Sequence, residues 1–118
     1  MQKEPVREQL NRILSERILC LDGAMGTSVQ NQNLSEKDFK GERFKDHPVQ
    51  LKGNNDILSL TQPDIIQKIH EDFLEAGADL IETNSFSGTR LSQGEYKTDH
   101  LIHELNYTSA QIARKAAD

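Results

Sequence analysis

The chain has 118 residues, of which 14 are Lys or Arg and 19 are Asp or Glu, so its formal charge is -5. These charges form no block of one sign, which argues against nucleic-acid and anionic-membrane surfaces because both need clustered cations. No apolar run approaches the roughly 20 residues of a membrane span, and no signal-like segment follows the charged N-terminus, so we expect a cytoplasmic protein. The single cysteine, Cys20, excludes an internal disulfide and any multi-cysteine metal site in this stretch.

The first predicted elements are a helix and a short strand. Apolar residues recur at i, i+4, i+7 and i+8 from Val6, which predicts an amphipathic helix over residues 4–16. The apolar run 18–21 follows and is closed by Asp22 and Gly23, a pattern typical of a strand buried on both faces of a parallel sheet. A thiol inside such a strand is inert, so Cys20 is not expected to be a nucleophile.

Residues 26–60 are mostly polar, with only scattered apolar anchors. We expect a long ordered loop here, with one short helix around residues 36–39. Structureless loops of this length are uncommon in compact domains and are usually functional, so the loop is interpreted as part of a site.

The second half of the chain predicts a helix, a strand and a final helix. Thr61 is the expected N-cap, Pro63 lies in the first turn, and Gly77 caps the C-terminus of this helix in a left-handed conformation. The strand 78–84 follows at once, and after a second polar loop a helix begins near Asp99 and continues to the end. This order predicts an α/β fold with two parallel strands joined by right-handed crossovers.

The polar residues at the ends of the two strands form the candidate site. Asp22 and Glu82 can accept hydrogen bonds from a substrate ammonium, and the N–H groups of the turn at Gly23 can receive a carboxylate. The two clusters follow adjacent strands, so they favour amino-acid binding. An Asp-Gly pair that only makes a tight strand exit is the structural alternative.

Other motifs give no competing site. Residues 23–27 lack both the Lys-Ser/Thr ending of a P-loop and the third Gly of a dinucleotide fingerprint, so nucleotide binding is not expected. His100 and His103 do not match the spacing of a zinc-binding helix and are typical of a solvated helix start. His47 and His70 are isolated, and an exposed or packing role is expected for each.

The segment 18–27, Ile-Leu-Cys-Leu-Asp-Gly-Ala-Met-Gly-Thr, resembles the first strand and turn of the homocysteine S-methyltransferase family. Residues 51–58, 62–64, 75–79 and 81–84 are similar in order and spacing to the cobalamin-dependent branch of that family, the methionine synthases. The resemblance implies that residues 1–118 are the N-terminal portion of a homocysteine-binding domain. Its fold would be part of a (β/α)8 TIM-type barrel, incomplete because two strands cannot close a barrel, with a long first βα loop.

The resemblance also implies a methyltransferase that moves a methyl group from 5-methyltetrahydrofolate through cobalamin to homocysteine, giving methionine. In the family, zinc held by three later cysteines keeps the homocysteine thiol as thiolate, and these positions are absent here. We therefore expect no catalytic residue, no metal ligand and no bound cofactor in this chain, and no turnover in isolation. Its implied partners are homocysteine, the remaining barrel strands, and the folate- and cobalamin-binding modules.

By resemblance, seven residues would line the amino-acid pocket: Asp22, Gly23, Thr27, Glu82, Thr83, Asn84 and Ser85. Two alternatives remain open at this stage. One is a cobalamin-independent zinc homocysteine S-methyltransferase, and the other is a non-catalytic, truncated half-barrel.

Overall fold

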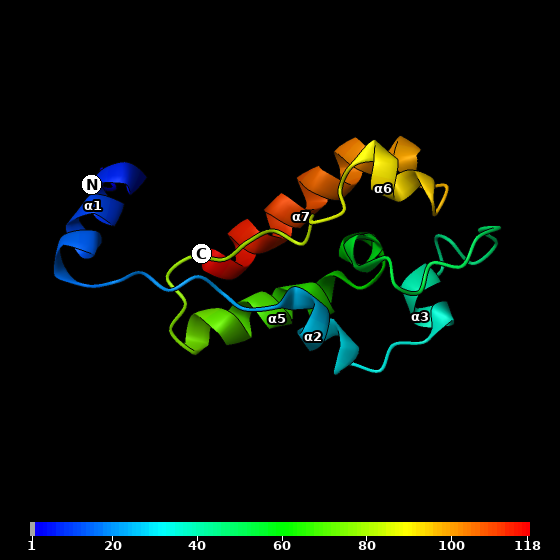
Figure 1. The fold of residues 1–118 in the computed structure, drawn as a ribbon, viewed down its shortest axis with the longest axis horizontal. Helices are drawn as coiled ribbons and strands as arrows, with labels where there is room; N and C mark the ends of the chain where they lie inside the picture. Colours follow the sequence, from blue (N-terminus) through cyan, green and yellow to red (C-terminus); the bar gives the residue numbers. More distant parts are fainter. Residues whose placement is uncertain (1) are drawn as a thin grey trace.

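The computed structural model describes residues 2–118, which form a chain of helices measuring 51 × 27 × 26 Å (Figure 1). In order, they are α1 (Val6–Glu16), α2 (Met25–Gln30), α3 (Glu36–Lys40), the 3-10 helix η1 (Asn55–Ile57), α4 (Leu58–Thr61), α5 (Pro63–Glu75), α6 (Arg90–Gly94), the 3-10 helix η2 (Asp99–Leu101) and α7 (Ile102–Ala117). Within this described range, no helix has the length and apolar character needed to cross a membrane.

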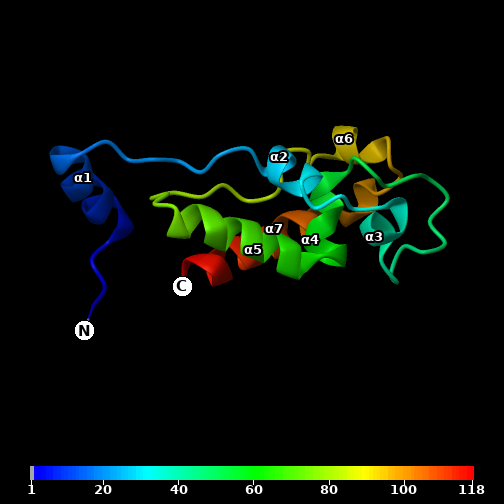
Figure 2. The same cartoon turned by 90° about the horizontal axis from the view of Figure 1, so that it is seen from below.

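Helices α5 and α7 lie side by side and carry much of the core (Figures 1 and 2). On α5, Ile66 and Ile69 are buried, and on α7 the buried Leu105 and Ile112 lie on the same face, at i and i+7. Pro63 occupies the first turn of α5, and Gly77 follows the helix with a φ of 112°, as the sequence predicts. The predicted cap is wrong in one detail, because the N-cap is Gln62 and Thr61 instead donates to the Ile57 carbonyl.

The predicted α/β barrel portion is wrong: residues 2–118 contain no strand and no sheet. The two segments expected as strands do run parallel, but they meet in a single bridge between Leu21 and Leu80. The next backbone donor, the N–H of Glu82, is bonded to the side chain of Asp22 at 3.1 Å, so the ladder of backbone bonds does not continue. A lone pair of segments without a further neighbour is too little to form a sheet.

The expected burial of the first segment is also wrong. Ile18 is 85% exposed and Leu21 is 59% exposed, and Cys20 is exposed as well. The apolar run 18–21 therefore leaves much of its side-chain surface open to water among the described residues.

Helix α1 stands apart from the other helices, to which it is joined by an extended segment (Figure 1). It falls within the range predicted for the first helix and is amphipathic, yet none of its residues is buried. An ion pair from Arg12 to Glu4, at 3.0 Å, joins it to the residues that precede it.

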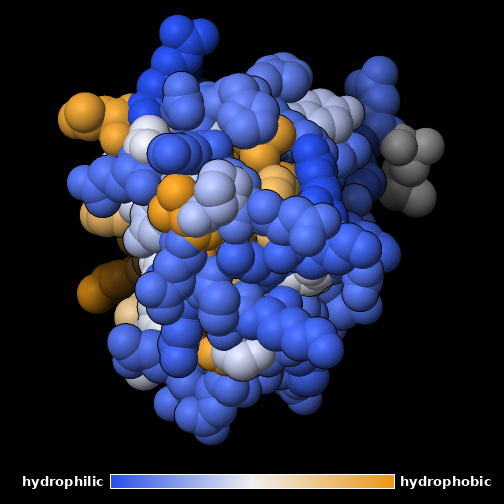
Figure 3. Space-filling model, turned by 90° about the vertical axis from the view of Figure 1, so that its right-hand side faces the viewer, coloured by the Kyte–Doolittle hydropathy of each residue, from blue (hydrophilic) through white to orange (hydrophobic). Residues whose placement is uncertain are grey.

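Residues 26–60 include most of α2, all of α3 and η1, and the start of α4, with turns and irregular backbone between them, so the prediction of one long loop with a single short helix is wrong apart from α3. Helix α3 is held by a capping box, in which Ser35 accepts from the Asp38 N–H and the Asp38 carboxylate accepts from the Ser35 N–H. The carboxylate of Glu36 accepts from the N–H groups of Leu51 and Lys52 at 2.6 and 2.7 Å, which ties the later part of the segment to α3. The aromatic side chains of this segment, Phe39 and Phe44, are buried, and the face seen in Figure 3 is mainly hydrophilic with a few separate hydrophobic side chains.

Candidate functional site

A cavity of about 660 Å³ lies where the two paired segments end and the loops that follow them meet η1 and α6. The turn at residues 22–26 forms one wall, and residues 82–87 form another. Figure 2 shows the two segments running together toward α2, over α5. A cavity of this volume is within the range of small-molecule sites in proteins.

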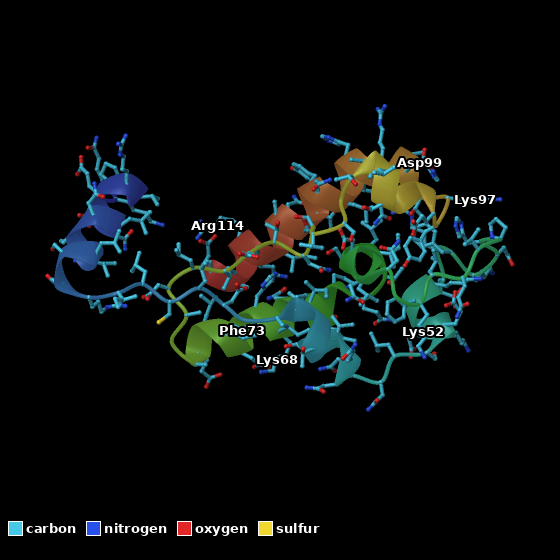
Figure 4. All side chains as sticks on the ribbon, viewed as in Figure 1. Lys52, Lys68, Phe73, Lys97, Asp99 and Arg114 are labelled. Carbon is cyan, nitrogen blue, oxygen red and sulfur yellow. The ribbon has the colours of Figure 1, made fainter. Side chains whose placement is uncertain are left out.

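The turn at Gly23 is pressed against α5. A Cβ at Gly23 would lie 3.0 Å from Cε1 of Phe73, which is on α5 beneath this segment (Figure 4). The glycine therefore allows the chain to pass close to the helix, and a larger residue would push the turn, with Asp22, away from its place at the cavity.

Asp22 and Glu82 are joined directly. The Asp22 Oδ2 accepts a hydrogen bond from the Glu82 backbone N–H at 3.1 Å, and the Asp22 N–H donates to the Leu80 carbonyl at 2.9 Å. Both carboxylates line the cavity. The sequence prediction that the two polar turns are neighbours is therefore confirmed in placement.

The back of the cavity is a network of buried amides. Asn84 is 5% exposed, and its Nδ2 donates to the Asn55 carbonyl at 2.9 Å and to the Ser59 hydroxyl at 3.2 Å. Asn54 and Gln93 exchange two hydrogen bonds through their side-chain amides, at 2.9 and 3.0 Å. Because buried polar groups that are fully paired are held rigidly, these contacts fix the loops that carry the cavity wall.

Asp56 is a buried carboxylate at the cavity, with 4% exposure. Burial raises its pKa to about 6, although hydrogen bonds from the backbone N–H groups of Ser87 and of Asp56 itself act in the opposite direction. The Ser87 N–H lies 3.1 Å from its Oδ2, so Asp56 links η1 to the loop after the second segment.

The cavity wall is acidic. Four carboxylates line it, from Asp22, Asp56, Glu82 and Glu95, and no Lys, Arg or His of the described chain lines it. Carboxylates bind ammonium groups strongly, whereas an anion without a compensating charge would be repelled. The wall therefore suits a ligand with a cationic end. The first turn of α2, whose N-cap Ala24 makes no side-chain cap bond, offers N–H groups for a carboxylate end.

Six of the seven residues predicted from the sequence line the cavity: Asp22, Gly23, Glu82, Thr83, Asn84 and Ser85. Thr27 does not line it, although it lies on α2 just beyond the turn. The Thr83 and Ser85 hydroxyls are hydrogen-bonded to each other at 2.6 Å.

Four further residues line the cavity and were not predicted individually: Asn54, Asp56, Glu95 and Tyr96. The first two lie in the segment 26–60, which was interpreted from the sequence as part of a site. Asn54 and Asp56 belong to the polar run after Gly53. The position of this run, inside a long segment between two predicted elements, is the feature of the sequence that indicates a site there. Glu95 and Tyr96 lie at the end of α6, in the region expected to be a second polar loop, and nothing in their spacing indicates a site.

The histidines stay outside the cavity. His70 is fully buried on α5, and His47 Nε2 is 2.7 Å from the Tyr96 carbonyl oxygen. His103 is stacked on Tyr107 on α7. Among residues 2–118, no three side chains of the metal-binding types come together.

The described residues thus hold an acidic cavity between two neighbouring turns, and its volume is in the range of small-molecule sites. Comparison with protein families identifies the chain more closely. Residues 19–118 match the family described as homocysteine S-methyltransferase, and the chain belongs to this family. The family implies a methyltransferase, with homocysteine as the methyl acceptor.

Proposed function

We propose that this chain binds homocysteine in the acidic cavity, with the ammonium group on Asp22 and Glu82 and the carboxylate on the N–H groups of the turn at residues 23–26. The proposal is carried by the placement of both carboxylates at one cavity in a chain of the homocysteine S-methyltransferase family. Homocysteine is a zwitterion at neutral pH, so an acidic wall beside exposed N–H groups complements both of its ends.

We further propose that the enzyme is a cobalamin-dependent methionine synthase, which passes a methyl group from 5-methyltetrahydrofolate through cobalamin to homocysteine. The support is the similarity of residues 51–58, 75–79 and 81–84 to that branch. We place the enzyme in the cytoplasm, because its one cysteine and its evenly spread charge are typical of that compartment.

A zinc ion would hold the homocysteine thiol as thiolate, the form that attacks a methyl group. The described residues do not fit this ion, since they contain one cysteine and no group of three metal-binding side chains. We propose that zinc and cobalamin are held by residues other than these, and that the part of this chain is to bind the amino-acid end of homocysteine.

Isothermal titration calorimetry of the chain with homocysteine tests the binding proposal. Glu82→Gln keeps the shape of the side chain and removes its charge, so binding should weaken about tenfold or more, as expected for loss of a charge-assisted hydrogen bond worth about 1.5–3 kcal/mol. N-acetylhomocysteine, which lacks the ammonium, should bind the wild-type chain equally weakly.

Asp46→Ala is the control, because Asp46 is exposed and does not line the cavity. It should bind homocysteine as the wild type does. Equal affinity for homocysteine and its N-acetyl derivative would contradict the assignment of the carboxylates to the ammonium.

The methyl donor is tested separately, by following methionine formation from homocysteine with either methylcobalamin or S-methylmethionine. The chain in isolation is expected to form methionine with neither. Turnover with S-methylmethionine would reject the cobalamin-dependent assignment in favour of the cobalamin-independent branch.

A further inference from the structure

Arg17 and Asp79 form a bidentate ion pair between parts of the chain 62 residues apart. Arg17 Nη1 donates to Asp79 Oδ2 at 2.7 Å, and Nη2 donates to Oδ1 at 2.6 Å. The Asp79 Oδ2 also accepts from the Cys20 backbone N–H at 2.9 Å. The Arg17 guanidinium, followed by the Cys20 N–H, holds the pKa of Asp79 well below its usual range.

The pair lies where the two paired segments begin, at the opposite end from the cavity. Arg17 is the C-cap of α1 and starts the first segment, while Asp79 starts the second. From there the segments are joined by N–H groups of Asp79 and Leu80 to the Cys20 carbonyl, at 2.8 and 3.2 Å, and then by Asp22 N–H to the Leu80 carbonyl.

Few bonds therefore set the register of the two segments. The pairing includes one bridge, between Leu21 and Leu80, and ends in the bond from the Glu82 N–H to the Asp22 carboxylate. A shift of one residue in paired extended segments turns each side chain to the opposite face, so Asp22 and Glu82 would no longer both reach the cavity.

We propose that Arg17 and Asp79 are positioning residues for the cavity: their ion pair fixes the register that brings Asp22 and Glu82 together. Neither residue lines the cavity, so they act through the segments and not on the ligand. This inference rests on the proposed binding of homocysteine at that cavity.

The chain contains a matched control for an ion pair without this role. Arg43 and Glu104 form an equally close bidentate pair, with distances of 2.5 and 2.7 Å, between residues 61 apart. Their side chains are 45% and 43% exposed, and neither lines the cavity. This pair joins the residues after α3 to α7, so its loss should not change the register of the two segments.

The test compares four variants with the wild-type chain: Arg17→Gln, Asp79→Asn, both together, and Arg43→Gln. Homocysteine affinity is measured by calorimetry, and exchange of the Glu82 and Asp22 amide hydrogens by NMR. Arg17→Gln and Asp79→Asn should each weaken homocysteine binding about tenfold and speed exchange of both amides by a similar factor, since small misplacements of binding groups carry effects of this size or larger.

The double variant should bind no more weakly than either single variant, because each removes the same interaction. Arg43→Gln should bind within about twofold of the wild type. Exchange at Ile66 and Leu105, in the helical core, should be unchanged in all four variants.

The outcomes separate this inference from the proposal on which it rests. If the wild-type chain binds homocysteine and Arg17→Gln and Asp79→Asn bind it equally well, the positioning role is overturned and the proposed function stands. A wild-type chain that does not bind homocysteine overturns both.

Faster exchange throughout α5 and α7 in Arg17→Gln would show general destabilisation and overturn the positioning role. Asp79→Asn guards against a trivial loss of structure, because the asparagine Oδ1 can still accept from the Cys20 N–H. Weaker binding in this variant, with an intact helical core, assigns the effect to the ion pair.

Discussion

His70 makes the stability of this chain depend on pH in a way that a single substitution can isolate. Its side chain is 0% exposed, and neither ring nitrogen has a hydrogen-bond partner within the protein. Burial lowers its pKa from 6.5, and the charge of Asp22 opposes this only in part. The folded chain therefore holds His70 as the neutral imidazole, whereas the unfolded chain takes up a proton near pH 6.5.

The direction of the effect follows from this difference. Above pH 6.5 both states are neutral at His70, and as the pH falls below 6.5 the unfolded state binds the proton first. The free energy of unfolding should therefore decrease with falling pH, by up to about 1.4 kcal/mol per pH unit, until the lowered pKa of the folded state is reached.

Asp56 acts in the opposite direction over part of the same range. Its pKa is raised from 3.8 to about 6, so between these values the folded chain binds the proton more tightly and gains stability as the pH falls. The pH profile of the wild type alone combines both residues. A difference between wild type and a His70 variant contains only the His70 contribution.

The variant is His70→Leu, whose side chain has a similar volume and no polar atoms. At pH 7.5 it should raise the free energy of unfolding by about 1 kcal/mol, since a buried polar group without a partner costs about 1–3 kcal/mol. At pH 5.5 the gain should be up to about 1.4 kcal/mol greater. Urea unfolding followed by circular dichroism at both pH values gives the two differences.

His100→Leu is the control, because His100 is exposed to water in the folded chain. Its difference from the wild type should be the same at both pH values. A His70→Leu difference that is also constant between pH 7.5 and 5.5, or that shrinks as the pH falls, would refute the reasoning.

Three further predictions concern other contacts. Asp56→Asn should raise the free energy of unfolding by about 2–3 kcal/mol at pH 7.5, where the buried charge is unfavourable, and by little at pH 4, as urea unfolding at the two pH values will show. Gly77→Ala should lower the free energy of unfolding by about 1–2 kcal/mol, because φ at this residue is 112°. Gly94→Ala is the control: its added Cβ also meets no atom within 4 Å, and it should raise the free energy of unfolding by about 0.5 kcal/mol. Thermal melts of the two variants and the wild type give the comparison. Ser35→Ala should lower the free energy of unfolding by about 1 kcal/mol, because it removes the capping box of α3. Urea unfolding followed by circular dichroism measures the change, and a free energy of unfolding equal to that of the wild type would contradict the prediction.

Local signals in the sequence predicted the helices that carry strong periodicity. Residues of α5 are apolar at helical spacing, and its ends are marked by Pro63 and Gly77, so both the helix and the left-handed turn after it could be foreseen. The parallel approach of Leu21 to Leu80 was also foreseen, because each segment follows a helix or a turn that directs it.

The strands were predicted wrongly because strand formation depends on partners far away in the chain. An apolar run such as 18–21 shows that burial is needed, but it does not show what would cover it or how many backbone bonds will form. Helices α2, η1 and α4 within residues 26–60 were missed for a related reason. They are short, and η1 and α4 are fixed by distant contacts, such as the bonds from the Asn84 side chain to the Asn55 carbonyl and the Ser59 hydroxyl.

Single site residues were predicted where they follow the paired segments, whereas the segment 26–60 was assigned to a site only as a whole. Asp22 and Glu82 stand at the ends of apolar runs, and this position marks them. Asp56 and Tyr96 line the cavity because of how η1 and α6 pack, and the spacing of residues in the sequence does not predict that packing.

The central claim is that two neighbouring turns form one cavity for the amino-acid end of homocysteine. It is tested most directly by titrating the isotopically labelled chain with homocysteine and following each backbone amide by NMR. We predict saturable shifts at residues 22–26 and 82–85 together, with one shared dissociation constant. Shifts confined to one of the two turns, or to the outer face of α7, would contradict the claim.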